Sequence, residues 1–204
     1  GPCGDVNNID FHGKRAPRQP FEQIRIVAAK VADASWRASR GIEEYPSDAP
    51  VAMRQREVPL EWRKPSQELV DRAKNILAMS KEEQTKLPRL ATNYAQRTLS
   101  QEKRVGKADC LVQAIRIGDQ AIVSFPFETF VETGLEIKKK SPFKHTFVIE
   151  LANGSYGYLP TPKHHELGGY ETWLGTNKVQ KDGSDLLTRN LLEMLNELHS
   201  RKDK

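Results

Sequence analysis

An apolar run that ends in a carboxylate is the first feature of this sequence that could carry chemistry. The stretch "IVSFPFETFVETGLE" (122–136) begins with β-branched and aromatic residues typical of a strand, and a helical pattern follows Glu128. We therefore expect Glu128 directly after a strand, in the first turn of a helix. There its carboxylate either complements the helix dipole or serves as a metal ligand or general base. The pattern alone leaves both interpretations open.

A second group of polar side chains lies in a stretch rich in Gly, Pro, Tyr and His, from residue 152 to residue 183. Tyrosines in such a stretch usually bury the ring, and adjacent histidines are usually solvated. A phenol can also ligate a metal or donate a hydrogen bond to a developing oxyanion, and connections of this length are usually functional. The side chains of interest are Tyr156, Tyr158, His164, His165, Glu166, Tyr170 and Glu171.

The N-terminal stretch "CGDVNNIDFHG" (3–13) gathers Asp, Asn and His side chains within a few residues. This composition is typical of a turn, and it could also present polar groups at the edge of a site. The sequence has no serine in a GxSxG setting, no HExxH and no glycine-rich phosphate loop. No self-contained nucleophile is evident, because neither cysteine has a nearby base.

The elements that must position these groups follow from apolar periodicity. Alternating or continuous apolar runs predict an extended segment at 51–62, a hairpin around Gly118-Asp119 and a buried strand at 145–151. Helical spacing predicts helices at 21–40, at 66–79 with Ser66 as the N-cap, from Ser80 with a capping box to Glu83, at 94–102, after Glu128 and after Ser184. The last of these helices should carry one apolar face, formed by Leu187, Leu191, Met194, Leu195 and Leu198. We expect one α/β domain over residues 1–204, a layered structure with a mixed β-sheet flanked by helices.

Charge and composition narrow the range of partners. The net charge of +5 is spread along the chain and concentrates only in short runs such as 138–140. Because a nucleic-acid surface needs basic residues clustered on one face with interleaved aromatic residues, we expect no nucleic-acid partner. A peripheral contact with an anionic membrane surface is compatible with this charge. No stretch has the length of a transmembrane helix, and Cys3 and Cys110 either pair or stay free.

Three segments together resemble the neutral/alkaline non-lysosomal ceramidases. "GDVNN" is similar to their GDVSPN, and "AIRIGDQAIVSFPFE" is similar to a strand-turn-strand that ends in PGE. "NGSYGYLPTPKHHELGGYE" is similar to their NxYxxYxTTxEEYxxQRYE and is the most specific of the three. The order and approximate spacing also match. The resemblance extends over essentially the whole chain and corresponds to the later part of the family's catalytic domain.

The resemblance implies a zinc site and a hydrolase. The family consists of zinc amidases that cut the N-acyl bond of the sphingolipid ceramide, with two His, one Glu and one Tyr on the metal. Glu128 and Tyr158 match the Glu and Tyr ligands, and Tyr170 matches the tyrosine that stabilises the oxyanion. The two histidines would lie before Gly1, so the resemblance implies a C-terminal portion that needs the N-terminal part of the same protein. It also suggests a secreted or periplasmic location.

The sequence departs from the family pattern at the expected nucleophile. Asn7 stands where the family has a serine. Because an amide cannot attack a carbonyl, the resemblance implies attack by metal-activated water, with Asn7 at most positioning or polarising a group. His165 and Gly168-Gly169 replace the family's Tyr and Gln-Arg, which alters the expected recognition of the head group. We assign Asp5, His165 and Trp173 to substrate contact.

Two functions therefore compete. The first is a zinc-dependent amidohydrolase acting on a small-molecule or lipid-like amide. The second is a non-catalytic relative that binds a ligand through residues 153–173. Loss of the serine favours the second. Retention of Glu128, Tyr158 and Tyr170 favours the first, because packing does not require these three residues together.

Overall fold

The computed structural model describes residues 1–7, 12–13, 17–45 and 47–200. The chain divides into two compact units. The larger unit contains Gly1–Val6 and Pro50–Lys204, and the smaller contains Asn7–Ala49. The residues expected to carry chemistry fall in the larger unit, with the exception of Asn7.

The described residues of the smaller unit form one helix, α1 (Glu22–Arg40), which confirms the helix predicted at 21–40. It ends at Gly41, after basic residues in the last turn that suit the helix dipole. No residue of α1 is buried, and large apolar side chains such as Ile24 and Trp36 are exposed. Among the residues that the structure describes, no helix has the length and apolar character needed to cross a membrane.

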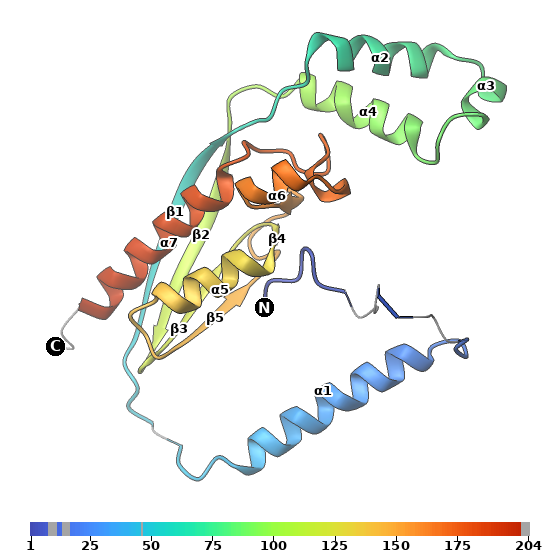
Figure 1. Ribbon diagram of the computed structural model, residues 1–204. Helices are drawn as coiled ribbons and strands as arrows, with labels where there is room; N and C mark the ends of the chain where they lie inside the picture. Colours follow the sequence, from blue (N-terminus) through green and yellow to red (C-terminus); the bar gives the residue numbers. More distant parts are fainter. Residues whose placement is uncertain (8–11, 14–16, 46, 201–204) are drawn as a thin grey trace. The chain divides into compact units, whose positions relative to one another are not determined.

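The larger unit is built on a mixed four-stranded sheet with the order β1-β2-β3-β5 (Figure 1). The strands are β1 (Val51–Glu61), β2 (Lys107–Ile117), β3 (Gln120–Ser124) and β5 (His145–Ile149). β1, β2 and β3 pair antiparallel, and β5 pairs parallel to β3. Gly118 and Asp119 form the predicted hairpin turn, and Gly118 has the positive φ of 58° that such turns favour. The predicted mixed sheet is confirmed.

β5 is less buried than its apolar sequence predicted. Phe147 and Ile149 are 56% and 47% exposed, whereas Val148 between them is buried. β5 is an edge strand, and within the larger unit α7 and α5 pack on the face of the sheet that carries the core, so alternate side chains of β5 point away from that core. The prediction of a buried strand was wrong because a continuous apolar run does not reveal whether both faces are covered.

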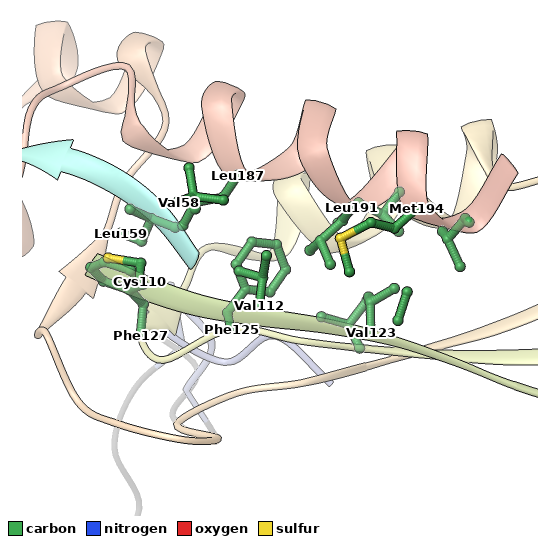
Figure 2. Packing of buried hydrophobic residues seen from close by; sticks show 14 of the residues in the cluster. Val58, Cys110, Val112, Val123, Phe125, Phe127, Leu159, Leu187, Leu191 and Met194 are labelled. Atoms are coloured by element: carbon green, nitrogen blue, oxygen red, sulfur yellow. The ribbon is translucent and has the colours of Figure 1, made fainter. Parts of the chain in front are cut away.

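Two helices cover the buried face of the sheet. α7 (Gly183–Ser200) packs against β1 and β2, and α5 (Val131–Lys140) packs against α7 and β5. Figure 2 shows Leu187 of α7 beside Val58 of β1, and Leu191 and Met194 of α7 directed toward the part of the sheet that carries Val112 and Val123. All five apolar side chains on this side of α7 are at most 1% exposed, as the helical spacing predicted: Leu187, Leu191, Met194, Leu195 and Leu198.

A helical hairpin is inserted between β1 and β2 (Figure 1). It consists of α2 (Gln67–Ala78), the short α3 (Lys81–Thr85) and α4 (Ala91–Glu102). Ser66 caps α2 by accepting from the Leu69 N–H, and Ser80 forms a complete capping box with Glu83. These local signals were read correctly from the sequence because capping involves neighbours along the chain.

The Gly/Tyr/His-rich stretch contains short regular elements. They are β6 (Tyr158–Leu159), α6 (Pro162–Leu167) and a 3-10 turn, η1 (Tyr170–Thr172). β6 pairs with β4 (Glu128–Thr129) in a separate two-stranded sheet. Glu128 is therefore in a strand, and α5 begins only at Val131. The expectation that Glu128 lies in the first turn of a helix was wrong, because its backbone pairs with β6, which is distant in the sequence.

Replacing Leu191 with Ala should lower the free energy of unfolding by about 3 kcal/mol, because it leaves a cavity where α7 meets the sheet. Leu135→Ala is the matched control, since Leu135 on α5 is 57% exposed and should change stability little. Urea denaturation of both variants checks this. Equal losses would show that α7 does not supply the core contact.

Candidate active site

Glu128 and Tyr158 are placed side by side by the pairing of β4 with β6. The two strands are parallel and in register, with Glu128 opposite Tyr158. The Glu128 N–H donates to the Gly157 carbonyl at 3.0 Å, and the Tyr158 N–H donates to the Thr176 carbonyl at 3.2 Å. Because opposed residues in a sheet project to the same side, the carboxylate and the phenol share one half-buried face.

Tyr170 joins this pair from η1. Its hydroxyl lies 3.2 Å from the Tyr158 hydroxyl, and the two rings meet edge to face at 5.6 Å. The hydrogen bond with Tyr170 raises the pKa of the Tyr158 phenol, and burial, a hydrogen bond to Glu128 and its charge act in the same direction. Tyr158 is therefore a neutral phenol near pH 7. The three residues matched to the ceramidase motifs are brought together by three separate segments.

The N-terminal motif docks beside the same strand. The Gly4 N–H donates to the Thr129 carbonyl at 2.9 Å, and a Cβ on Gly4 would lie only 2.6 Å from the Glu128 carbonyl oxygen. Only glycine permits this approach. Asp5 then accepts a 2.9 Å hydrogen bond from the Val131 N–H, the first amide of α5. The Asp5 carboxylate therefore caps the N-terminus of α5, where a negative charge is stabilised by the helix dipole.

Cys3 continues this docking. Its thiol donates to a Glu150 carboxylate oxygen at 3.0 Å, and its N–H donates to the other oxygen. The hydrogen bond to Glu150 is the largest effect that raises the pKa of the Cys3 thiol. Cys3 is exposed, Cys110 is buried, and both are free, so the open question of their pairing is resolved in favour of two thiols.

The remaining predicted site residues lie in different environments. Trp173 is half exposed and packs edge to face against Tyr94 of α4 at 5.2 Å. The buried Nε2 atom of His165 has no hydrogen-bond partner among the described residues. Burial, followed by the charges of Arg63, Lys181 and His164, lowers the pKa of His165 to about 4. Asn7 is exposed and is the first residue of the smaller unit. Substrate contact by these residues stays a prediction.

A second group of possible metal ligands lies at the start of α5. Oxygen or nitrogen atoms of Asp5, Glu132 and His164 lie within 4.8 Å of one another. His164 Nε2 is 3.5 Å from a Glu132 oxygen, while its Nδ1 is 2.7 Å from the Thr161 hydroxyl. No local pattern points to Glu132, because its proximity to Asp5 depends on how the N-terminal segment docks.

Asn177 was also missed by the sequence analysis. Its side chain is fully buried and donates to the Tyr158 carbonyl at 3.1 Å, while its carbonyl oxygen accepts from Arg63. It therefore fixes the backbone of the strand that presents the Tyr158 phenol. A single Asn in a glycine-rich stretch reads as a turn residue, and its burial is visible only in the fold.

The arrangement is similar in fold to solved ceramidase structures. Neutral ceramidase from Pseudomonas aeruginosa aligns with a TM-score of 0.58 and 14% identity, covering 97% of this chain and 36% of that chain. A structure described as ceramidase complexed with C2 aligns with a TM-score of 0.54 and 14% identity, covering 89% and 35%. No protein-family model and no curated protein sequence matches this chain. The likeness establishes a ceramidase-like fold, and the chain spans about a third of those structures' length.

His165 should make stability fall in mild acid. Its ordinary pKa of about 6.5 applies to the unfolded chain, and the folded value is about 4. Between these values the unfolded state binds a proton that the folded state does not, so the free energy of unfolding decreases as the pH falls from about 6.5 to about 4. Above this window the residue contributes no pH dependence.

Urea midpoints measured across that window should fall less steeply for His165→Gln than for the unchanged chain. His145→Gln, at an exposed position on β5, is the control and should keep the original slope. An unchanged slope in His165→Gln would mean that this imidazole is solvated and titrates normally.

Proposed function

We propose that this chain carries part of the active site of a zinc-dependent hydrolase that cleaves the N-acyl bond of a lipid-like amide. The observation that carries the proposal is the convergence of Glu128, Tyr158 and Tyr170 in a ceramidase-like fold. These are the residues that the sequence resemblance assigns to the zinc ligands and the oxyanion contact. They come from three segments, and their packing does not require two phenols and a carboxylate to meet.

The donor set fits zinc in part. A carboxylate oxygen and a phenol oxygen are both acceptable zinc ligands, and a catalytic site uses three or four protein ligands. Glu128 and Tyr158 would hold the metal, together with two histidines from the N-terminal part of the same protein. When bound, zinc would polarise the amide carbonyl and make a water molecule a better nucleophile. Because the pKa of Tyr158 is raised, zinc affinity should increase with pH as the phenol proton is displaced.

Tyr170 is suited to the role of oxyanion donor. Its hydroxyl lies 3.2 Å from the Tyr158 hydroxyl, and the residue is 48% exposed, so a substrate can reach it from solvent. A donor fixed before the reaction stabilises developing negative charge without reorganisation. Asn7 has no nucleophilic atom, so its part is limited to positioning or polarising a group.

Exposed apolar side chains support a lipid-like substrate. Leu167, Tyr170 and Trp173 follow one another around α6 and η1 and are 71%, 48% and 52% exposed. Such side chains beside a polar site are typical of a surface that contacts an acyl chain or a membrane interface. The neutral imidazole of His165 lies in the same segment, on α6. A peripheral membrane contact through this segment is part of the proposal.

Glu128→Gln and Tyr158→Phe should each weaken zinc binding at least about tenfold, because the first removes the negative charge of a ligand and the second removes a ligand oxygen, while both preserve shape. Calorimetric titration of zinc, with elemental analysis, measures this on the present chain and on any longer natural form that includes it. Glu57→Gln and Tyr45→Phe change exposed residues of the same types and should bind zinc like the unchanged chain.

The group formed by Asp5, Glu132 and His164 offers a competing location for the zinc ion, and the same titration tests it. If Glu132→Gln and His164→Gln abolish zinc binding while Glu128→Gln does not, the metal belongs to the Asp5–Glu132–His164 group. That result, or absence of zinc from every form, would refute the assignment of Glu128 and Tyr158 as zinc ligands.

The alternative is a ligand-binding relative without catalysis, which Asn7 at the serine position favours. Tyr170→Phe separates the two functions. In a hydrolase it should lower kcat for N-acyl substrates about a hundredfold with little change in KM, because the contact acts in the transition state. Tyr45→Phe is the control. No turnover by the unchanged zinc-loaded protein, with ligand affinity altered in Tyr170→Phe, would establish the non-catalytic function.

A further inference from the structure

A cationic pocket lies between α4 and the segment that follows η1. It has a volume of about 280 Å³, and its lining includes Arg97, Arg104 and Lys178 together with the polar side chains of Asn93, Gln96 and Ser100. Among the residues that the structure describes, no carboxylate lines this pocket or forms an ion pair with any of the three cations. The described lining of the pocket therefore carries three cationic side chains and no carboxylate.

The two arginines are held in place by aromatic rings. The Arg104 guanidinium lies 4.0 Å from the centre of the Trp62 ring, and its Nε donates to Gln101 Oε1 at 3.1 Å. Arg97 lies 5.1 Å from the centre of the Tyr94 ring and donates to the Thr176 hydroxyl at 3.4 Å. Each guanidinium has five N–H donors, so these contacts orient the groups and leave most donors for a ligand.

Lys178 is fixed opposite the arginines through its backbone. Its carbonyl oxygen accepts from the buried Gln101 side chain and from the Arg63 N–H. The neighbouring Gly175 has a φ of 85°, and a Cβ there would lie 2.7 Å from Arg97 Cβ, so a glycine allows the segment to approach α4. Burial and then the charges of Arg104 and Arg97 lower the pKa of Lys178, and the charge of Glu128 acts against them. Bringing these cations together is therefore unfavourable in the absence of an anion.

We propose that this pocket binds a phosphate-type oxyanion, carried either by a soluble compound or by a lipid head group. Two guanidinium groups with free donors recognise phosphate oxygens in a fixed geometry, and the ammonium group supplies a third charge. An anion would relieve the mutual repulsion of the three cations. The volume accommodates a phosphate group and the atoms next to it. This binding does not depend on hydrolysis at Glu128, Tyr158 and Tyr170.

Calorimetric titration with inorganic phosphate and flotation with phosphatidylcholine vesicles, with and without phosphatidic acid, test the proposal on the full chain. We expect binding to phosphate, to phosphatidic acid vesicles or to both, weakened about tenfold or more in Arg97→Gln and in Lys178→Gln. Lys139→Gln removes one exposed positive charge on α5 and should bind like the unchanged chain. Arg97→Lys should retain part of the affinity.

The probes distinguish the two sources. Binding to free phosphate supports a soluble ligand, and binding only to phosphatidic acid vesicles supports a lipid head group. The proposal is overturned if neither probe binds, or if both glutamine variants bind as tightly as the unchanged chain. Circular dichroism verifies folding, and Lys178→Gln provides the test if Arg97→Gln unfolds.

Discussion

The candidate site depends on the parallel pairing of β4 with β6, in which Glu128 lies opposite Tyr158. Two residues from each side form this small sheet, which could not be stable alone. Its surroundings hold it in place. The Gly4 N–H bonds to the Thr129 carbonyl, and the buried Asn177 side chain bonds to the Tyr158 carbonyl. The small sheet therefore joins the segment that follows β3 to the Gly/Tyr/His-rich stretch, and the N-terminal segment binds to it through Gly4.

The alternation of side chains along this backbone explains why an apolar run ends in a carboxylate. Phe127 and Thr129 are fully buried, and Glu128 between them is directed away from the core. On the partner strand Leu159 is buried and Tyr158 is only partly buried. The buried residues connect the small sheet to the core formed by α7 and the main sheet, as Figure 2 shows for Phe127 and Leu159. Burial of one face therefore fixes the direction of the two oxygen donors on the other.

Features that depend on neighbours along the chain could be predicted, and those that depend on distant partners could not. The Ser66 and Ser80 caps, the Gly118-Asp119 turn and the buried face of α7 follow from local spacing. Glu128 was assigned to a helix because α5 follows so closely, whereas pairing with a strand 30 positions away decides its state. The meeting of Glu128, Tyr158 and Tyr170 was expected from the resemblance alone. The contacts of Asn177, of Glu132 and of the cations around Lys178 could not be predicted, because each joins segments that are distant in the sequence.

Charged residues of both the candidate active site and the cationic pocket affect the pKa of Lys178. Burial and then the charges of Arg104 and Arg97 oppose the protonated form of Lys178, whereas the charge of Glu128 favours it. Lys178 therefore lies at the boundary between a region with a carboxylate and a region with only cations. Coulomb interactions in partly buried surroundings act over several ångströms, so an anion would be attracted to the pocket and repelled from Glu128. An anion bound in the pocket would act on Lys178 in the same direction as the carboxylate of Glu128, because both favour its charged form.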